Sequence, residues 1–416
     1  MPLSGFDRRE GELFCEGVSL CAIARKAGTP TYVYSGTAIR DNYRSYDTAL
    51  ASLSHEIHYA VKANSSLGVL ALLAREGAGF DIVSGGELFR VLQAGGSPEK
   101  VVFSGVGKSR QDMAYALEQG VGWFNCESEA ELHILAELAS EAGCAPSVAL
   151  RVNPNIDADT HPYIATGLSA HKFGIATAEA ERIYQRAAEF EPLRIEGVSC
   201  HIGSQIFDTQ AFFDALNLLL ALIDRLRQGG SHISQLDLGG GLGIAYRDSE
   251  ETPAIAAYAG GLATVLDGTG LKLTLEPGRS IVGQAGVLLM SVLYRKPTAT
   301  KTFVIVDAAM NDLIRPALYQ AHHEILPVID YGRPNVRADV VGPICESGDF
   351  LAKDRDLPDV EPGELLAAAT VGAYGSVLSS NYNSRGRAAE VLVEGDRWRV
   401  IRDRESLEDL TRGERA

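Results

Sequence analysis

The feature that most constrains the fold of this chain is a regular alternation of apolar, strand-like runs with helical stretches between Ile57 and Glu276. Eight runs are predicted to be strands: Ile57–Lys62, Phe80–Ser84, Val101–Ser104, Trp123–Cys126, Ser147–Val152, Gly197–His201, Ile233–Leu238 and Leu271–Glu276. Helical periodicity is found in Leu67–Arg75, Glu87–Ala94, Arg110–Glu118, Ser128–Ala142, Ala178–Phe190, Phe212–Arg227 and Pro253–Leu266. Eight strands that alternate with helices predict a parallel, TIM-like (β/α)8 barrel, and the length of the span fits one.

A doubly wound open sheet is the alternative, because it alternates in the same way. Such a sheet carries Gly-x-Gly-x-x-Gly after its first strand when it binds a dinucleotide. That pattern does not follow Ile57–Lys62. The barrel is therefore favoured.

After Arg279 the pattern changes to β-rich runs joined by turns. These runs are Val287–Tyr294, Phe303–Val306, Val328–Ile329, Arg337–Val341, Leu365–Val371 and Ala389–Val393. They predict a mostly β second domain. Leu13–Cys15 and Thr31–Tyr34 precede the barrel pattern, so the N-terminal segment is expected to join this domain. We predict a barrel over residues 35–280 and a β-rich domain over residues 1–34 and 281–416.

Composition excludes several functional classes. A net charge of −16 over 416 residues argues against a nucleic-acid or anionic-membrane binder, which needs a basic surface. The N-terminus has no apolar signal-peptide core, and no stretch approaches the length of a membrane span. The six cysteines are scattered without a CxxC pair, so no disulfide framework and no metal site are expected. A cytoplasmic location is predicted.

The predicted strands end in polar residues or glycine. In a barrel of this kind such ends face a common mouth, where active sites lie. The residues at these ends are Lys62, Asp81 with Ser84, Ser104, Asn125 with Glu127, Arg151 with Asn153, His201, Gly239–Gly241, and Glu276. A purely structural barrel has no need for such a ring, so it indicates a site.

Two of these positions can be interpreted either as structural or as chemically active. Lys62 ends a buried strand, where an ammonium is costly unless it is paired or its pKa falls, so it is a salt-bridge partner or a reactive amine. Gly239-Gly-Gly-Leu-Gly243 is either a tight turn or a phosphate cradle of backbone N–H groups. It is not a P-loop, because no Gly-Lys-Ser/Thr follows.

Two further positions are open in the same way. Glu276 can pair with Arg279 as a structural carboxylate, or it can face a ring nitrogen that must stay protonated. His201 is a buried core histidine or a flat surface for an aromatic cofactor. An amine, a phosphate cradle, a carboxylate and an imidazole together are what pyridoxal 5'-phosphate (PLP) requires.

The connection from Asn153 to Ile175 is unusually long and has no helical period. Long connections of this kind in compact domains are functional or disordered. Its aromatic and glycine content favours an ordered active-site loop over a surface insertion.

Seven motifs carry a resemblance to a known family. In chain order they are YAVKAN, HIGSQ, GGGLG, EPGR, RPALY, GPICESGD and GAYG, from about Tyr59 to Tyr382. They resemble the barrel-type (fold type III) PLP-dependent decarboxylases, and within that group they are most similar to the diaminopimelate decarboxylase family. The resemblance implies PLP-dependent decarboxylation of meso-2,6-diaminopimelate to L-lysine and carbon dioxide, the last step of lysine biosynthesis.

The resemblance also implies residue roles. Lys62 would carry PLP as a Schiff base, His201 would stack on its ring, and Glu276 would face the ring nitrogen. Other cofactor contacts would come from Ser204, Gly241, Gly278, Arg279 and Tyr374. The substrate would be held by Arg279, Arg315, Tyr319, Glu346 and Tyr374, and Cys345 would supply the proton that replaces carbon dioxide. In the family, Cys345 and Glu346 reach the partner subunit's site, which implies a homodimer with active sites at the interface.

Composition alone gives less support to the functional roles of the second-domain residues than to those of the barrel residues. Cys345 could be an inert buried thiol, Arg315 a surface charge and Tyr374 a packing residue, and only the order of the motifs favours their functional roles.

The charged residues of the motifs also bear on the choice of substrate. Relatives that act on ornithine or arginine carry aspartate where this chain has Glu346. Two arginines, Arg279 and Arg315, fit a substrate with carboxylates at both ends. The alternatives are D-lysine, D-ornithine, arginine or a carboxylated polyamine on the same scaffold. A non-catalytic PLP carrier is disfavoured by the long β-rich region, and a racemase by the CESGD motif.

Overall fold

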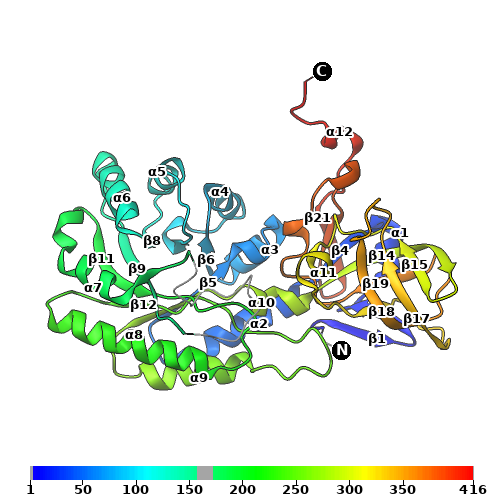
Figure 1. Ribbon diagram of the computed structural model, residues 1–416, viewed down its shortest axis with the longest axis horizontal. Coiled ribbons are helices and arrows are strands. Elements are labelled where there is room, and N and C mark those ends of the chain that lie inside the picture. Colours follow the sequence, from blue (N-terminus) through cyan, green and yellow to red (C-terminus); the bar gives the residue numbers. More distant parts are fainter. Residues whose placement is uncertain (1–2, 157–171, 416) are drawn as a thin grey trace. The chain divides into compact units, whose positions relative to one another are not determined.

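The structure is a computed structural model that describes residues 3–156 and 172–415. The chain forms two compact units. One comprises Asn42–Ile244 and Thr252–Ser280, and the other comprises Met1–Asp41, Ala245–Glu251 and Ile281–Ala416. We call the first the barrel unit and the second the β-rich unit, after the elements that each contains (Figure 1).

The barrel unit is built on eight parallel strands in a closed ring. The strands are β5 (His55–Ala60), β6 (Gly79–Ile82), β7 (Val101–Phe103), β8 (Trp123–Cys126), β9 (Ser147–Asn153), β11 (Arg194–Ser199), β12 (Gln235–Asp237) and β13 (Lys272–Leu275). Each strand pairs with the next in this order, and β13 pairs with β5 to close the ring. The short β10 (Ile175–Ala176) also pairs with β9. The predicted barrel is confirmed.

Helices lie around the ring of strands (Figure 1). They are α3 (Leu67–Arg75), α4 (Gly85–Gln93), α5 (Arg110–Glu118), α6 (Glu129–Ala142), α7 (Thr177–Gln185), α8 (Gln210–Gln228) and α9 (Ile255–Leu266), and α2 (Gly36–Ala49) precedes them. The hydroxyls of Ser84, Ser109 and Ser128 accept hydrogen bonds from N–H groups in the first turns of α4, α5 and α6. Each such cap stabilises its helix by about 1 kcal/mol and fixes the point where the loop after a strand must end.

The β-rich unit is organised around the long strand β14 (Gly286–Pro297). β4 (Thr31–Ser35) lies between β14 and β20 (Ala389–Glu394), antiparallel to the first and parallel to the second. The same sheet contains β15 (Thr302–Val306), β16 (Ile325–Pro327), β17 (Asn335–Val341), β18 (Phe350–Pro358), β19 (Leu365–Ala368) and β21 (Arg397–Arg402). A small sheet of β1 (Phe6–Arg9), β2 (Glu12–Cys15) and β3 (Val18–Ser19) precedes α1 (Leu20–Ala27).

The hydrophobic core of this unit explains why the N-terminal segment belongs to it. Leu13, Leu20 and Val33 are fully buried in one cluster with Val287 and Val391. Burying a side chain of this size contributes about 1.5–3 kcal/mol, so β2, α1 and β4 are held by the C-terminal strands. The predicted fold class, a barrel with a mostly β second domain that includes the N-terminal segment, is confirmed.

The structure corrects several predicted elements. β5 ends at Ala60, and Lys62 lies in a 3-10 turn, Val61–Ala63, instead of in the strand. Val328–Ile329 is not a strand; β16 ends just before it, and Ile329 makes a single bridge to Glu12. β18 and β21 were not predicted. Most of the predicted Asn153–Ile175 active-site loop, residues 157–171, lies outside the described residues.

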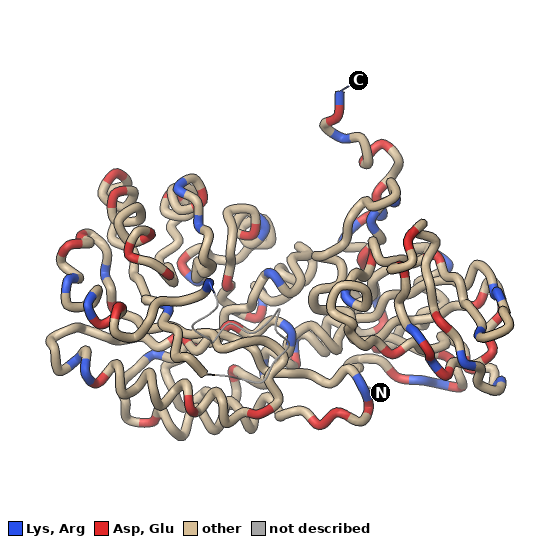
Figure 2. Tube along the Cα trace, in the orientation of Figure 1, with Lys and Arg blue, Asp and Glu red and all other residues tan. Residues whose placement is uncertain are grey.

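Acidic and basic residues are interspersed along both units (Figure 2). In the part of the chain that the structure describes, no helix has the length and apolar character needed to cross a lipid bilayer.

Candidate active site

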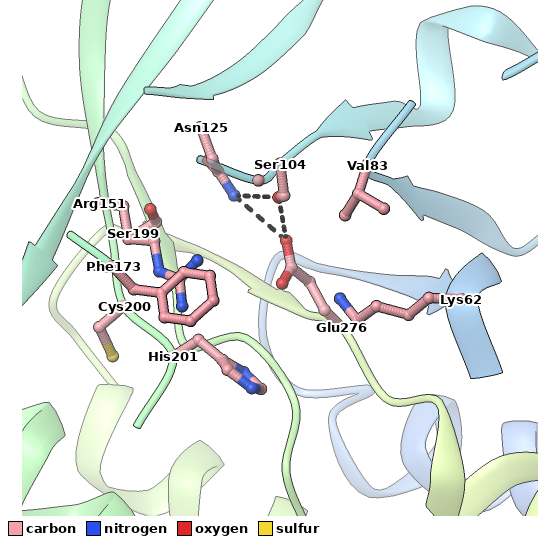
Figure 3. Close-up of a pocket in the computed structure, with 11 residues that line it drawn as sticks. Lys62, Val83, Ser104, Asn125, Arg151, Phe173, Ser199, Cys200, His201 and Glu276 are labelled. Atoms are coloured by element: carbon pink, nitrogen blue, oxygen red, sulfur yellow. Dashed lines mark hydrogen bonds between the residues drawn. The ribbon is translucent and has the colours of Figure 1, made fainter. Parts of the chain in front are cut away.

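A cavity of about 190 Å³ lies in the barrel unit where the predicted strand ends meet. It is lined by six of the predicted positions: Lys62, Ser104, Asn125, Arg151, His201 and Glu276. In Figure 3 the amine of Lys62 points toward the carboxyl group of Glu276, with Ser104 and Asn125 on its other side. The fold therefore brings the ring of polar strand ends into one site.

Lys62 follows β5 directly, and its turn places the side chain at the cavity. Its Nζ donates to Asp81 Oδ2 at 2.7 Å. The Asp81 side chain is fully buried, whereas the Lys62 side chain is 38% exposed. The salt bridge that the sequence allowed is thus present, and the amine still faces the cavity, as a nucleophile requires.

Glu276 is buried beside two donors. Its Oε1 accepts from Ser104 Oγ at 3.1 Å and from Asn125 Nδ2 at 3.2 Å. Burial raises the pKa of Glu276 well above its usual range, and the nearby carboxyl groups of Asp237 and Asp81 raise it further. A cationic group placed against Glu276 would relieve this cost.

His201 is neutral in this site. Burial lowers its pKa well below the usual value, and the charges of Arg151 and Lys62 act in the same direction. Its Nδ1 accepts from the N–H of Gly240 at 3.2 Å, which leaves the ring proton on Nε2. A neutral, oriented imidazole therefore lines the cavity.

The turn Gly239–Gly243 is packed too tightly for side chains. A Cβ at Gly240 would lie 2.2 Å from the carbonyl oxygen of Glu276, and one at Gly241 would lie 2.3 Å from that of Gly203. The N–H groups of Gly239, Gly240 and Gly243 donate to Asp237, His201 and Ile206. These three N–H groups therefore have partners within the chain.

Other predicted cofactor residues lie beside this turn. Arg279 Nη2 donates to Ser204 Oγ at 3.2 Å. Gly278 lets the end of β13 approach β5, because a Cβ there would lie 2.9 Å from Ala63 Cβ. The structure therefore brings Ser204, Gly241, Gly278 and Arg279 into the same part of the barrel unit as Lys62 and Glu276.

Arg151 belongs to the cavity but was predicted only as a polar strand end. Its Nη1 donates to the buried Glu127 Oε1 at 2.8 Å, and its guanidinium lies 4.9 Å from the centre of the Phe173 ring. Glu127 Oε2 accepts from the N–H of Gly174 at 2.9 Å. Arg151 and Glu127 together hold the segment directly before β10.

Lys108 was not predicted, although it supports the cavity wall. Its fully buried amine donates to the carbonyl oxygens of Gly105 and Asn125 and to Glu131 Oε1, at 2.7, 2.6 and 2.6 Å. All three of its N–H groups are thereby used. Lys108 joins the ends of β7 and β8 to α6.

We expect Lys108→Met to destabilise the barrel, because it leaves the carboxylate of Glu131 buried without its cation. Loss of one partner of a buried ion pair costs about 3–5 kcal/mol. Urea unfolding followed by circular dichroism should show a lower midpoint than wild type. Arg110→Met is the control, since its ion pair with Glu137 is exposed. Equal midpoints for Lys108→Met and Arg110→Met would contradict the structural role of Lys108.

The remaining predicted residues lie in the β-rich unit. Arg315, in α11 (Arg315–Tyr319), is buried and is not a surface charge. Its Nη1 donates to Tyr246 Oη at 2.9 Å and lies 3.3 Å from His323 Nε2. His323 Nδ1 lies 2.8 Å from the carbonyl oxygen of Ala369, so Nδ1 carries the ring proton and Nε2 accepts. Tyr246 and His323, which sequence reasoning missed, fix the guanidinium of Arg315.

Cys345 is exposed in a loop held by its neighbours. Its N–H donates to Asn383 Oδ1 at 3.1 Å, and Tyr382 Oη donates to Glu346 Oε2 at 2.7 Å. Asp349 accepts from the N–H groups of Met310 and Ile344, both at 2.7 Å. The CESGD motif therefore combines a shaping residue, Asp349, with three exposed residues, Cys345, Glu346 and Ser347. Tyr319 and Tyr374 are half-buried in the same unit.

Known proteins resemble this chain over almost its whole length. The family described as "Pyridoxal-dependent decarboxylase, pyridoxal binding domain" matches residues 37–283. A diaminopimelate decarboxylase of Pseudomonas aeruginosa is 58% identical over 98% of both chains, and one of Neisseria meningitidis is 50% identical over 97% of this chain and 99% of its own. The chain belongs to the diaminopimelate decarboxylase family.

Solved structures of this family agree with the fold. The Helicobacter pylori enzyme, solved in complex with L-lysine, has a TM-score of 0.90 and 42% identity and covers 94% of this chain and 98% of its own. The M. jannaschii enzyme has a TM-score of 0.94 and 35% identity, over 100% of this chain and 99% of its own. The family resemblance inferred from the seven motifs is confirmed.

Proposed function

We propose that this chain is a PLP-dependent decarboxylase that removes carbon dioxide from the D-configured centre of meso-2,6-diaminopimelate and yields L-lysine. The observation that carries the proposal is the placement of the Lys62 amine and the Glu276 carboxyl group in one cavity of the barrel unit. The strong similarity to diaminopimelate decarboxylases over full length supports the choice of reaction.

The residues present fit PLP. Its aldehyde requires an amine, which Lys62 offers, and its ring nitrogen requires a carboxylate, which Glu276 offers. Its phosphate requires cationic and N–H donors, and Arg279 and Ser204 lie with Gly241 in the same unit. The turn carries no side chains at Gly240 and Gly241, so its backbone can approach a phosphate closely.

When bound, PLP supplies the electron sink that accepts the electron pair left by departing carbon dioxide. Asp81 accepts from the Lys62 amine and holds it at the cavity wall. Ser104 and Asn125 hold Glu276 in place, where Glu276 would keep a proton at the ring nitrogen. The neutral His201 would lie against the ring without adding a charge that would oppose the sink.

Substrate recognition is assigned to arginines and to a pair of residues from the second subunit. Arg279 and Arg315 bind carboxylates through their forked N–H groups. Tyr319 and Tyr374, from the RPALY and GAYG motifs, complete the substrate contacts. Glu346 contacts the distal ammonium, and Cys345 donates the proton that replaces carbon dioxide. Both residues act in the active site of the partner subunit, in a homodimer located in the cytoplasm. Sedimentation of the purified chain as a monomer during turnover would contradict that arrangement.

The reaction is tested by supplying the PLP-loaded protein with single amino acids and measuring carbon dioxide and the amine product. Meso-diaminopimelate should give carbon dioxide and L-lysine in equal amounts. D-Lysine, D-ornithine, arginine and carboxylated polyamines should give little. Faster release from any of these would replace the proposed substrate while keeping the chemistry, and no release from any of them would refute the decarboxylase proposal.

Arg315→Met is expected to lower kcat/KM for diaminopimelate. A hydrogen bond to a charged group contributes about 1.5–3 kcal/mol, which corresponds to roughly 10- to 150-fold. Uptake of PLP should be unchanged, because Arg315 is assigned to the substrate. Substrates without the second carboxylate, such as D-lysine, should be affected little.

The control is Arg337→Met, which removes an exposed guanidinium on β17 of the same unit. It should leave both substrates unaffected. An equal loss for diaminopimelate and D-lysine in Arg315→Met would show that Arg315 does not bind the distinguishing carboxylate.

A further inference from the structure

Two buried carboxyl groups lie side by side in the barrel unit. Asp237, at the end of β12, is 1% exposed, and Glu276, directly after β13, is 7% exposed. Asn125 Nδ2 donates to both, at 2.7 Å to Asp237 Oδ2 and 3.2 Å to Glu276 Oε1. Both carboxyl groups therefore lie within hydrogen-bonding distance of one nitrogen atom. Asp237 is therefore part of the surroundings of Glu276, although no role has been assigned to it so far.

The amide of Asn125 is held in one orientation. Trp123 Nε1 donates to Asn125 Oδ1 at 3.2 Å, so the carbonyl end of the amide faces the indole. The amino end must then face the carboxyl groups and Ser104 Oγ, which lies 3.1 Å away. The two carboxyl groups thus share a donor whose position is fixed from β8.

Two buried carboxyl groups that share one donor are costly to ionise together. Neither can donate to the other while both are ionised, so a proton held by one member of the pair relieves the repulsion. Burial raises the pKa of both Asp237 and Glu276, and the nearby carboxyl group of Asp81 acts in the same direction on Glu276. Asp237 accepts hydrogen bonds on both of its oxygens, from Gly239 and Asn125, which favours its ionised form, so the pair holds one proton in common, mainly on Glu276.

Asp237 also supports the glycine turn. Its Oδ1 accepts from the N–H of Gly239 at 2.8 Å, and the carbonyl oxygen of Gly239 accepts from the N–H of Glu276 at 2.7 Å. One side chain therefore supports the turn assigned to the phosphate and shares a donor with the carboxyl group assigned to the ring nitrogen.

We propose that Asp237 is a positioning residue that shares one proton with Glu276 at neutral pH and strengthens the hold of Glu276 on a ring-nitrogen proton. This inference rests on the proposed function only for its second half. With PLP in the site, the O–H bond of Glu276 would break and its proton would form an N–H bond with the ring nitrogen, so that Glu276 would be left as a carboxylate beside that cation. Asp237 remains ionised behind Glu276 and adds a second negative charge that favours the protonated ring.

The first half is tested on the full-length protein without PLP, by infrared titration of its protonated carboxyl groups. Wild type should contain a protonated carboxyl group near neutral pH that is absent from Glu276→Gln. In Asp237→Asn the same group should lose its proton at a pH lower by about one unit or more, because a negative neighbour has been removed. An unchanged midpoint in Asp237→Asn, or persistence of the group in Glu276→Gln, would overturn the proposal.

The second half is tested on the PLP-loaded protein by the pH dependence of its visible spectrum. Asp237→Asn should lower the pH of the ring-nitrogen transition by about one unit or more. A merely structural role in the glycine turn would weaken PLP binding without moving this midpoint, and that result would overturn the positioning role. Glu196→Gln is the matched control, since Glu196 borders a different cavity and contacts Ser147; its midpoints should equal those of wild type.

The two halves can fail separately. If the protein takes up no PLP, the proposed function is refuted, whereas the titration without PLP still decides whether the carboxyl groups share a proton. If Asp237→Asn does not fold, Glu276→Gln carries the test, because the shared proton must disappear with that carboxyl group.

Discussion

Lys62→Arg protein is expected to lose its visible PLP absorbance. It should also release carbon dioxide on the order of 10³-fold more slowly than wild type, which is the size of loss seen when a group that takes part in a reaction is removed. Arginine keeps the positive charge and can maintain the ion pair with Asp81, which lies 2.7 Å from the Lys62 amine. A guanidinium cannot replace the amine that carries the aldehyde.

This substitution separates the two roles of Lys62 that the sequence left open. If Lys62 acted only as the salt-bridge partner of Asp81, Lys62→Arg would keep both absorbance and activity. Lys100→Arg provides the control, because the Lys100 amine contacts the carbonyl oxygen of Gly77 at the surface of the barrel unit. The control should match wild type in both measurements.

Cys345→Ala is expected to take up PLP normally and to turn over roughly 10²–10⁴-fold more slowly, the loss typical for a proton donor. The thiol is exposed in the single chain and is held in a shaped loop by Asn383 and Asp349. Pre-steady-state measurement should place the loss after carbon dioxide release, because the thiol acts on the carbon that has already lost its carboxylate.

A second cysteine serves as the matched control for this prediction. Cys144 is half-buried after α6 in the barrel unit, and Cys144→Ala should leave turnover unchanged. Wild-type turnover in Cys345→Ala would remove the thiol from the reaction and return it to the inert role that composition allowed.

The barrel could be predicted because its elements follow simple rules. Strands such as Trp123–Cys126 and helices such as Arg110–Glu118 match their predicted bounds, since a short apolar run and a capped 3.6-residue period are local signals. The missed strands β18 and β21 contain the charged runs KDRD and RWRVIR. Their pairing with β17 and β20 is a tertiary effect that local sequence does not encode.

The candidate site was predictable in part. Polar strand ends identified the cavity, because a parallel barrel brings these ends together whatever the residues are. The residues that hold them, such as Trp123, Lys108 and Asp237, carry no motif of their own. His323 and Tyr246 lie far apart in the sequence, and their contacts with Arg315 form only in the folded β-rich unit. Such supporting contacts cannot be identified from the sequence alone.

The central claim, that Lys62 is the reactive amine of a PLP site in the barrel, is tested most directly by locating the bound cofactor. Sodium borohydride treatment of the PLP-loaded protein joins PLP permanently to the amine that carries it, and peptide mass spectrometry then identifies that residue. We expect one pyridoxyl group per chain, on Lys62. A pyridoxyl group on another lysine, with Lys62 unmodified in active protein, would contradict it.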